Sequence, residues 1–290
     1  LALYLAAGYV SRKKRLEKLL EMATQLKERY LLPEVMPVPD QAEEQVYYQL
    51  LKLAGKSMLE RIGEVERERG EYRTYIEQWV HEVKTPITAL KLLCENNRSP
   101  FSREVLAELE NINRCAEQAL YYARSEHTEK DYSIREMSLA DVVHGAIADN
   151  KYLLRQCDMA ITVDDLEIVV YADDKWVRFI LNQIISNAVK YRAPQQPALH
   201  IFTERSGDQV LLSVADNGIG IPESDLPRVF EKGFTGQNGR TIHSSTGIGL
   251  YLCKRLCDKL GIGLAASSSG SGTTIPLSFH INDFITGVQS

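Results

Sequence analysis

The chain has 290 residues, of which 44% are hydrophobic and 25% are charged, and its formal net charge is −5. This composition is typical of a globular protein of about two domains, and it excludes a disordered chain and a fibrous repeat. A nucleic-acid-binding surface requires clustered Lys and Arg, which the acidic balance does not indicate. The five cysteines are irregularly spaced, which argues against a secreted disulfide scaffold and favours a reducing compartment.

The N-terminal end combines an apolar run with a basic cluster. Residues 1–10 read LALYLAAGYV, and Arg-Lys-Lys-Arg follows at 12–15. A helix needs roughly 20 apolar residues to span a bilayer, but basic residues directly after an apolar helix are typical of a cytoplasmic membrane boundary. We therefore expect residues 1–10 to be the end of a transmembrane helix. An interfacial or merely buried helix is the alternative.

Helices dominate the next part of the chain. We predict a helix over 18–30, broken by three prolines between 31 and 40, and then one long helix over 43–97. Its length without caps favours a coiled coil. A turn at 96–100 precedes a second predicted helix, 102–126. We assign residues 11–72 to a juxtamembrane and signalling linker and residues 73–128 to a helical hairpin.

Each helix of the hairpin carries one apolar stripe, because residues three or four apart share a helix face. The predicted stripes are Ile76, Trp79, Val83, Ile87, Leu90 and Cys94 in the first helix and Val105, Leu109, Ile112, Ala116, Ala119 and Ala123 in the second. Two helices bury little surface on their own. The pattern therefore predicts that two copies of the chain form a four-helix bundle and hence a homodimer.

His81 lies off the first stripe, roughly 140° from Ile76 around the helix, and is expected to face solvent. Glu82 can orient an imidazole N–H, the Thr85 hydroxyl shares a face with His81, and Pro86 weakens the helix at this point. On position alone, an exposed histidine is an ordinary surface residue.

The string HEVKTP that begins at His81 resembles the phosphoacceptor box of bacterial sensor histidine kinases. The resemblance implies that His81 accepts the γ-phosphoryl group of ATP and that Glu82 is the base for this step. It also implies that Thr85 helps to position a water molecule when the phosphorylated partner is dephosphorylated.

From Tyr132 onward, strand-like runs alternate with helical segments, which is typical of an α/β or α+β layer domain. The expected strands are 160–163, 168–172, 198–204, 209–215 and 273–281. The boundary is expected near 129–133. The predicted fold is therefore multidomain: an α-helical hairpin forming a dimeric four-helix bundle, followed by an α/β sandwich over 133–290, which the resemblance identifies as the Bergerat (GHKL) ATP-binding fold.

The helix predicted over 174–191 ends in three side chains that suit a nucleotide. The amide oxygen of Asn187 can ligate Mg²⁺, the ammonium of Lys190 can neutralise phosphate, and the ring of Tyr191 can pack on a purine. Each is ordinary alone, but together they resemble the N-box of the histidine-kinase ATPase fold. One turn earlier, where the family often has Asn, this chain has Gln183, and the nearby Asn182 is out of register.

Two glycine-containing strings follow. DNGIGI begins at Asp216 after an apolar strand and contains Gly218 and Gly220, which let the backbone approach a ligand closely. As a bare pattern it also fits an ordinary turn. It resembles the first glycine box, in which Asp216 would bind the adenine amino group. The string TGIGL consists of Thr246, Gly247, Ile248, Gly249 and Leu250 and opens a helix, whose N-terminus can bind phosphate. It resembles the second glycine box, with Ser245 in place of the usual first glycine.

The segment between these strings is expected to cover the site. Phe230 opens FEKGFT, which resembles the F-box, and the polar Gly- and Ser-rich run 235–245, with His243, is expected to form an ATP lid. No Walker loop is present in the sequence, because Gly-Lys-Ser/Thr is absent.

The resemblance over residues 73–281 implies a sensor histidine kinase of a two-component system that needs ATP and Mg²⁺. It would phosphorylate His81 and pass the phosphoryl group to an Asp of a response regulator, with possible phosphatase activity. The N-terminal run and the helix strings look most like the intramembrane-sensing kinases linked to antimicrobial-peptide ABC transporters, which implies a cell-membrane location, a cytoplasmic kinase core and a transporter partner. Two alternatives are an ATPase of the gyrase, chaperone or mismatch-repair type and a non-catalytic module with a degenerate pocket.

Overall fold

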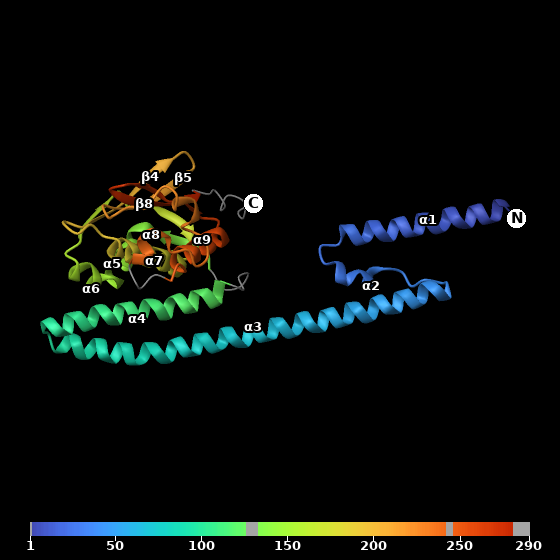
Figure 1. Ribbon diagram of the computed structural model, residues 1–290, viewed down its shortest axis with the longest axis horizontal. Helices are drawn as coiled ribbons and strands as arrows, with labels where there is room; N and C mark the ends of the chain where they lie inside the picture. The colour runs from blue at the N-terminus through green and yellow to red at the C-terminus, as the bar shows by residue number, and fades with distance from the viewer. Residues whose placement is uncertain (1, 126–132, 242–245, 281–290) are drawn as a thin grey trace. The chain divides into compact units, whose positions relative to one another are not determined.

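A computed structural model describes residues 2–125, 133–241 and 246–280 of the chain (Figure 1). The chain divides into two compact units, residues 1–74 and 75–290. The first is helical, and the second contains a helical hairpin and an α/β domain. The boundary predicted at 129–133 lies outside the described residues, except for Ser133, as do His243 and Ser245 of the predicted lid and second glycine box.

The first unit begins with α1 (Ala2–Gln25), which continues through the apolar run and the basic cluster without a break. The helix predicted over 18–30 is thus confirmed as far as Gln25, as the C-terminal part of α1, but it ends five residues earlier than predicted. A 3₁₀ turn (Arg29–Leu31) follows at the end of the predicted helix, and α2 (Leu32–Val35) lies inside the proline-containing segment 31–40 that was expected to break it. Pro33 lies in the first turn of α2, where a missing N–H costs nothing. None of the described helices has both the length and the apolar character needed to cross a bilayer.

The long helix α3 (Ala42–Asn96) is continuous through Pro86, and α4 (Pro100–Ser125) returns antiparallel to its C-terminal part (Figure 1). Both predicted helices are confirmed, with α4 starting two residues early because Ser99 accepts a hydrogen bond from the backbone N–H of Ser102 at 3.0 Å. Two ion pairs join the helices of this hairpin, Lys84–Glu117 at 2.9 Å and Arg124–Glu77 at 2.8 Å.

The apolar stripe of α3 differs in part from the prediction. Val80, which was not predicted, is only 2% exposed, whereas Trp79 and Leu90 are 41% and 46% exposed. One residue corresponds to about 100° around a helix, so Trp79 cannot share the face that Val80 turns to α4. On α4, Ile112 of the predicted stripe is likewise exposed. The buried face of the hairpin therefore differs from the predicted stripes, and some apolar side chains are left uncovered in the single chain.

The α/β domain contains two sheets. In the smaller one, β1 (Arg135–Ser138) pairs with β3 (Val169–Ala172). The larger has the order β2-β4-β5-β8-β6, with β7 also paired to β8, and only β2 and β4 are parallel. Its strands are β2 (Ala160–Asp164), β4 (Ala198–Ser206), β5 (Gln209–Asp216), β6 (Gly263–Leu264), β7 (Ser267–Ser269) and β8 (Gly272–His280). The five predicted strands are confirmed to within two residues, although position 281 lies outside the described residues.

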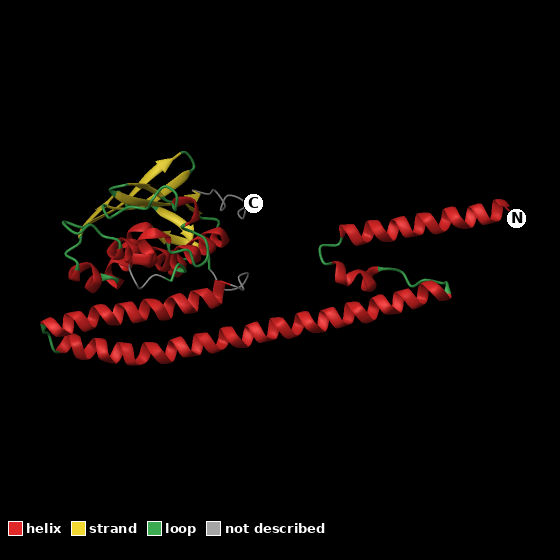
Figure 2. Cartoon of the chain, viewed as in Figure 1, coloured by secondary structure: helices red, strands yellow, loops and turns green. Residues whose placement is uncertain are grey.

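Helices form a second layer against the larger sheet, as Figure 2 shows. They are α5 (Leu139–Asp149), α6 (Lys151–Gln156), α7 (Asp174–Lys190), α8 (Gly236–Thr241) and α9 (Gly249–Leu260), with a 3₁₀ turn at Leu226–Arg228. The start of α7 is fixed by Asp173, whose carboxylate accepts the N–H groups of Lys175 and Trp176 at 3.0 and 3.1 Å. The core lies between the layers and includes both Cys253 and Cys257. Part of the predicted lid, α8, is helical.

Candidate ATP-binding site

A cavity of about 790 Å³ lies between α7, the loop after β5, α8, the start of α9 and the hairpin helix α4. This volume is typical of a small-molecule site. Nine of the eleven residues expected to bind ATP line it: Asn187, Lys190, Tyr191, Asp216, Gly220, Thr246, Gly247, Gly249 and Leu250. The fold thus brings the N-box and both glycine boxes, which are far apart in the sequence, to one cavity.

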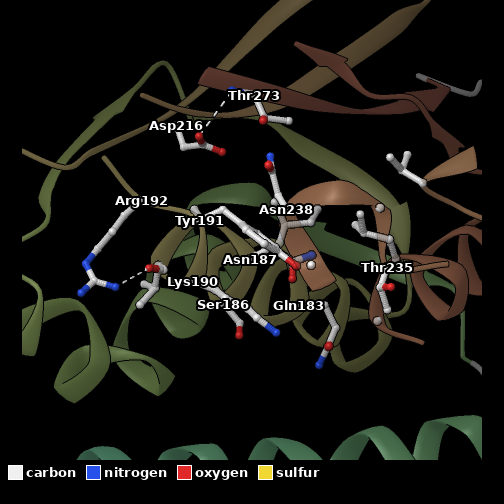
Figure 3. A pocket seen from close by; sticks show the side chains of 18 of the residues that line it. Gln183, Ser186, Asn187, Lys190, Tyr191, Arg192, Asp216, Thr235, Asn238 and Thr273 are labelled. Atoms are coloured by element: carbon white, nitrogen blue, oxygen red, sulfur yellow. Dashed lines mark hydrogen bonds between the residues drawn. The ribbon is translucent and has the colours of Figure 1, made fainter. Parts of the chain in front are cut away.

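Asp216 is held at the end of β5 by the backbone (Figure 3). Its Oδ1 atom accepts the N–H of Gly218 at 2.8 Å and that of Thr273 at 3.3 Å. Burial raises the pKa of Asp216, and these two backbone hydrogen bonds partly offset the effect. Among the described residues, its second carboxylate oxygen accepts no hydrogen bond. That oxygen is available to an amine of a ligand.

Gly218 is required at its position although it does not line the cavity. A Cβ atom there would lie 2.3 Å from the carbonyl oxygen of Tyr191. The loop therefore packs directly on the end of α7, and the N–H of Ile219 donates to the same carbonyl at 3.0 Å. Gly218 was expected to contact the ligand, but it does not line the cavity. Its N–H instead orients the carboxylate of Asp216.

Gly247 and the start of α9 form another wall. The backbone of Gly247 is left-handed, with φ of 64°, and a Cβ atom there would lie 2.5 Å from the carbonyl carbon of Gly233. Ile248, the N-cap of α9, makes no side-chain capping bond. Because Gly249 and Leu250 in the first turn line the cavity, the N-terminal N–H groups of α9 are placed to bind an anion.

Figure 3 shows Asn187 and Tyr191 in the middle of the cavity wall, between Asp216 at one end and Gln183 and Ser186 at the other. Among the described residues, the amide of Asn187 makes no hydrogen bond, so its oxygen is free to bind a metal ion. Asn182 is excluded from the site, as its register predicted: it bonds Asn150 at 2.9 Å and Asp149 at 3.1 Å behind the cavity wall.

Phe230 does not line the cavity. It is partly buried and packs against the core, whereas Phe234 of the same string reaches the cavity and lies under the guanidinium of Arg228 at 4.4 Å. The sequence motif alone does not show which of the two phenylalanine rings reaches the cavity. The conformation of the loop between them, which includes Gly233, places Phe234 there.

Several lining residues were not among the eleven predicted to bind ATP, although Thr235 and Asn238 belong to the predicted lid. From the α/β domain they include Ser186, Arg192, Ile221, Pro222, Asp225, Thr235, Asn238, Thr273 and Ile275, and from α4 they are Glu108, Asn111, Arg114, Cys115 and Gln118. The contribution of α4 has no signal in the sequence, because it depends on how the hairpin packs against the α/β domain.

His81 is exposed on α3 and does not line the cavity, which agrees with the expected outward orientation. Thr85 Oγ1 donates to the backbone carbonyl of His81 at 3.2 Å, and Glu82 accepts a hydrogen bond from Gln78 at 3.2 Å. None of these contacts involves the imidazole, which leaves the ring accessible.

Comparison with known proteins agrees with this geometry. Residues 172–283 match the family of histidine kinase-, DNA gyrase B- and HSP90-like ATPases. The chain is 37% identical over 210 residues to the sensor histidine kinase YxdK of Bacillus subtilis, which covers 71% of this chain and 64% of YxdK. It is 35% identical over 229 residues to the sensor protein kinase GraS of Staphylococcus aureus, covering 78% and 66%. The chain belongs to the bacterial sensor histidine kinases.

The match to solved structures concerns the fold. This sensor kinase superposes on full-length ShkA, crystallised with AMPPNP, with a TM-score of 0.50 at 19% identity over 70% of this chain and 45% of that chain. The α/β domain is thus an ATP-binding domain of this family, and the cavity that contains Asp216 and Asn187 is its candidate nucleotide site. The chain spans 64% and 66% of the length of the two curated relatives.

Proposed function

We propose that this chain is the kinase part of a two-component sensor, which phosphorylates His81 from ATP and passes the phosphoryl group to an Asp of a response regulator. One observation carries the proposal: an exposed histidine in an HEVKTP string shares a compact unit with a cavity built from all the ATP-binding boxes. In this proposal Glu82 is the base and Thr85 positions water for phosphatase activity.

Within the cavity, the adenine amine binds to Asp216 and the purine packs on Tyr191. The phosphates bind to Lys190 and to the N-terminus of α9, which Thr246, Gly247, Gly249 and Leu250 form. The unpaired amide of Asn187, a hard oxygen donor on the cavity wall, fits Mg²⁺, which takes few protein ligands and keeps several waters. Bound there with ATP, Mg²⁺ would neutralise charge on the phosphates, while positioning of the reactants provides most of the catalysis.

Transfer to His81 requires the ATP-binding domain to move relative to the hairpin. The cavity is bordered by α4, whereas His81 is on α3 and lies outside its lining. Domain movements of this kind are common steps in kinases. We therefore propose that the described arrangement precedes or follows transfer, and that residues 73–128 and 133–290 act as the phosphotransfer hairpin and the catalytic domain.

A homodimer is part of the proposal. The hairpin exposes the large apolar side chains Tyr75, Trp79, Leu90, Leu93, Phe101 and Ile112. Large apolar side chains exposed to water are candidates for an interface, and pairing with a second hairpin would cover them in a four-helix bundle. Whether His81 is phosphorylated by its own chain or by the partner depends on the handedness of the hairpin turn in that bundle.

The membrane connection rests on the N-terminus. The apolar residues 1–10 precede a basic cluster at 12–15, the pattern of a cytoplasmic membrane boundary. We propose that residues 1–10 are the end of a membrane-embedded segment, that residues 11–72 link it to the hairpin in the cytoplasm, and that an ABC transporter is a partner in the membrane.

The test is incubation of the purified chain with γ-³²P-labelled ATP and Mg²⁺. We expect acid-labile, alkali-stable label in the wild type and no label in His81→Gln, with unchanged nucleotide binding in the variant. Equal labelling of both proteins would reject His81 as the acceptor. Steady phosphate release without a phosphoprotein would favour the gyrase- or chaperone-type ATPase, and the absence of ATP binding would favour a non-catalytic module.

A further inference from the structure

A cation from the hairpin lies in the wall of the ATP cavity. Arg114 on α4 lines the cavity and donates from its NH2 group to Asn111 Oδ1 at 2.8 Å. No described carboxylate forms an ion pair with it. Glu108 and Glu110 on the same helix attract it without contacting it, and burial lowers the pKa of Arg114. Since a guanidinium has five N–H donors, most of them remain available to a ligand.

A second cation, Lys190 on α7, lies in the same wall. Its Nζ atom is 5.6 Å from the centre of the Tyr191 ring, and no described carboxylate pairs with it. Burial, and to a smaller extent the charge of Arg114, lowers the pKa of Lys190. Two partly buried cations that repel each other are unfavourable unless an anion lies between them. The pair thus forms a site for a strongly negative group.

An unpaired donor on α7 points to the same kind of ligand. Gln183 is only 6% exposed, lines the cavity, and its Nε2 atom is buried without a hydrogen-bond partner. Such a donor is costly unless a ligand acceptor satisfies it. Figure 3 shows Gln183 at the end of the cavity opposite Asp216. If Asp216 binds the adenine, this end receives the phosphates.

Contacts on both sides of Arg114 hold α4 against the ATP-binding domain. Glu110, one turn before it, accepts the backbone N–H groups of Tyr152 and Leu153 in the first turn of α6 at 3.2 and 3.0 Å. Tyr121, two turns after it, stacks on Phe179 of α7. The guanidinium therefore has a defined position at the cavity.

We propose that Arg114 is a phosphate-binding residue that the hairpin supplies to the nucleotide site, where it holds the terminal phosphate together with Lys190 and Gln183. The inference rests on the proposed function, because it takes ATP as the ligand. It adds that the nucleotide bridges the two domains. Bound ATP stabilises the contact of the catalytic domain with α4, away from His81, whereas ADP, which lacks the terminal phosphate, stabilises this contact less.

Calorimetric titration of the 290-residue chain with ATP, ADP and adenosine tests the assignment. The variant is Arg114→Gln, and the matched control is Arg103→Gln, which removes the same charge from an exposed position of α4 outside the cavity. A lost charge-assisted hydrogen bond predicts roughly ten-fold weaker ATP binding in Arg114→Gln. ADP binding should weaken less, adenosine binding should not change, and Arg103→Gln should behave as the wild type.

Hydrogen exchange supplies a second readout. The amides of Tyr152 and Leu153, which bond to the hairpin, should exchange more slowly with ATP than with ADP in the wild type, and equally with both in Arg114→Gln. Unchanged ATP affinity in Arg114→Gln, or an equal loss for ATP and adenosine, would overturn the inference while the proposed function stands. A wild-type chain that binds no ATP would instead remove the proposed function.

Discussion

The ring of Tyr121 on α4 stacks on the ring of Phe179 on α7, with centroids 4.0 Å apart and an angle of 28° between the planes. The Tyr121 hydroxyl donates to the carbonyl of Lys175 at 3.1 Å, and burial raises the pKa of Tyr121. This one side chain joins the hairpin to the helix that carries the N-box.

Replacement of Tyr121 tests this connection. Tyr121→Ala should release α4 from the domain, since an aromatic pair contributes about 0.5–1.5 kcal/mol beyond the buried area. Hydrogen exchange at Tyr152 and Leu153 should then become faster without nucleotide. Tyr121→Phe keeps the ring and should exchange nearly as the wild type does. Equal protection in all three proteins would show that the stack does not hold the hairpin.

The variant Asp216→Asn should bind ATP more weakly without a loss of folding stability. Because the pKa of Asp216 is raised in the folded protein, ionisation of this carboxyl group disfavours the folded state. The protonated group therefore contributes stability below the unfolded pKa, and this contribution is lost as the pH rises through the folded pKa. The amide avoids this loss. Urea unfolding should find the variant at least as stable as the wild type at pH 7.5, with a smaller difference at pH 4.5, although ATP binding is weaker.

The opposite pH trend, with the variant less stable at pH 7.5 than at pH 4.5 relative to the wild type, would contradict this account of Asp216. A variant that binds ATP with wild-type affinity would show that the carboxylate is not the group that contacts the base.

Gly247 and Gly261 offer a matched pair. Both have left-handed backbones, with φ of 64° and 68°, but a Cβ atom at Gly261 meets nothing within 4 Å, whereas one at Gly247 overlaps the backbone of Gly233. Gly261→Ala should cost about 1 kcal/mol from backbone strain alone. Gly247→Ala should cost at least about 2 kcal/mol more, because the chain must shift. Thermal unfolding measures both, and equal costs would mean that the packing at Gly247 is looser than described.

The proposed dimer is tested by Leu90→Glu. A charge on the uncovered apolar face of the hairpin should weaken association, because it would have to be buried without a partner. Val169→Glu places the same charge at an exposed apolar position of the α/β domain and should leave association unchanged. Sedimentation equilibrium compares the two. If both variants associate like the wild type, the dimer does not use this face.

Much of the α/β domain could be predicted from the sequence because its signals are local. The apolar periodicity of α7 and the strand runs at 198 and 209 depend on neighbouring residues. The choice of Asn187 over Asn182 came from the spacing of the N-box that this helix resembles, and the hydrogen bonds of Asn182 to Asp149 and Asn150 agree with its exclusion from the site. The boxes were found because each is a short continuous string.

The remaining features depend on contacts between distant segments. No pattern in α4 distinguishes Arg114 from Arg103, because only the packing of the hairpin places one of them at the cavity. The stripe of α3 was assigned to Trp79 rather than Val80 because both fit a helical spacing of three or four, and the partner helix selects between them. Phe230 and Phe234 were likewise separated only by the fold of the loop between them.

The way in which the backbone holds Asp216 bears on which purine the cavity can accept. With Oδ1 engaged by two N–H groups, the ionised side chain offers a single free acceptor and no donor. Adenine presents an amine at its six position, whereas guanine presents a carbonyl oxygen there. With guanine, its carbonyl oxygen and the free carboxylate oxygen of Asp216 would face each other as two acceptors in a partly buried place. Such unpaired polar groups strongly disfavour binding of the wrong ligand. GTP should therefore compete poorly even when it is abundant.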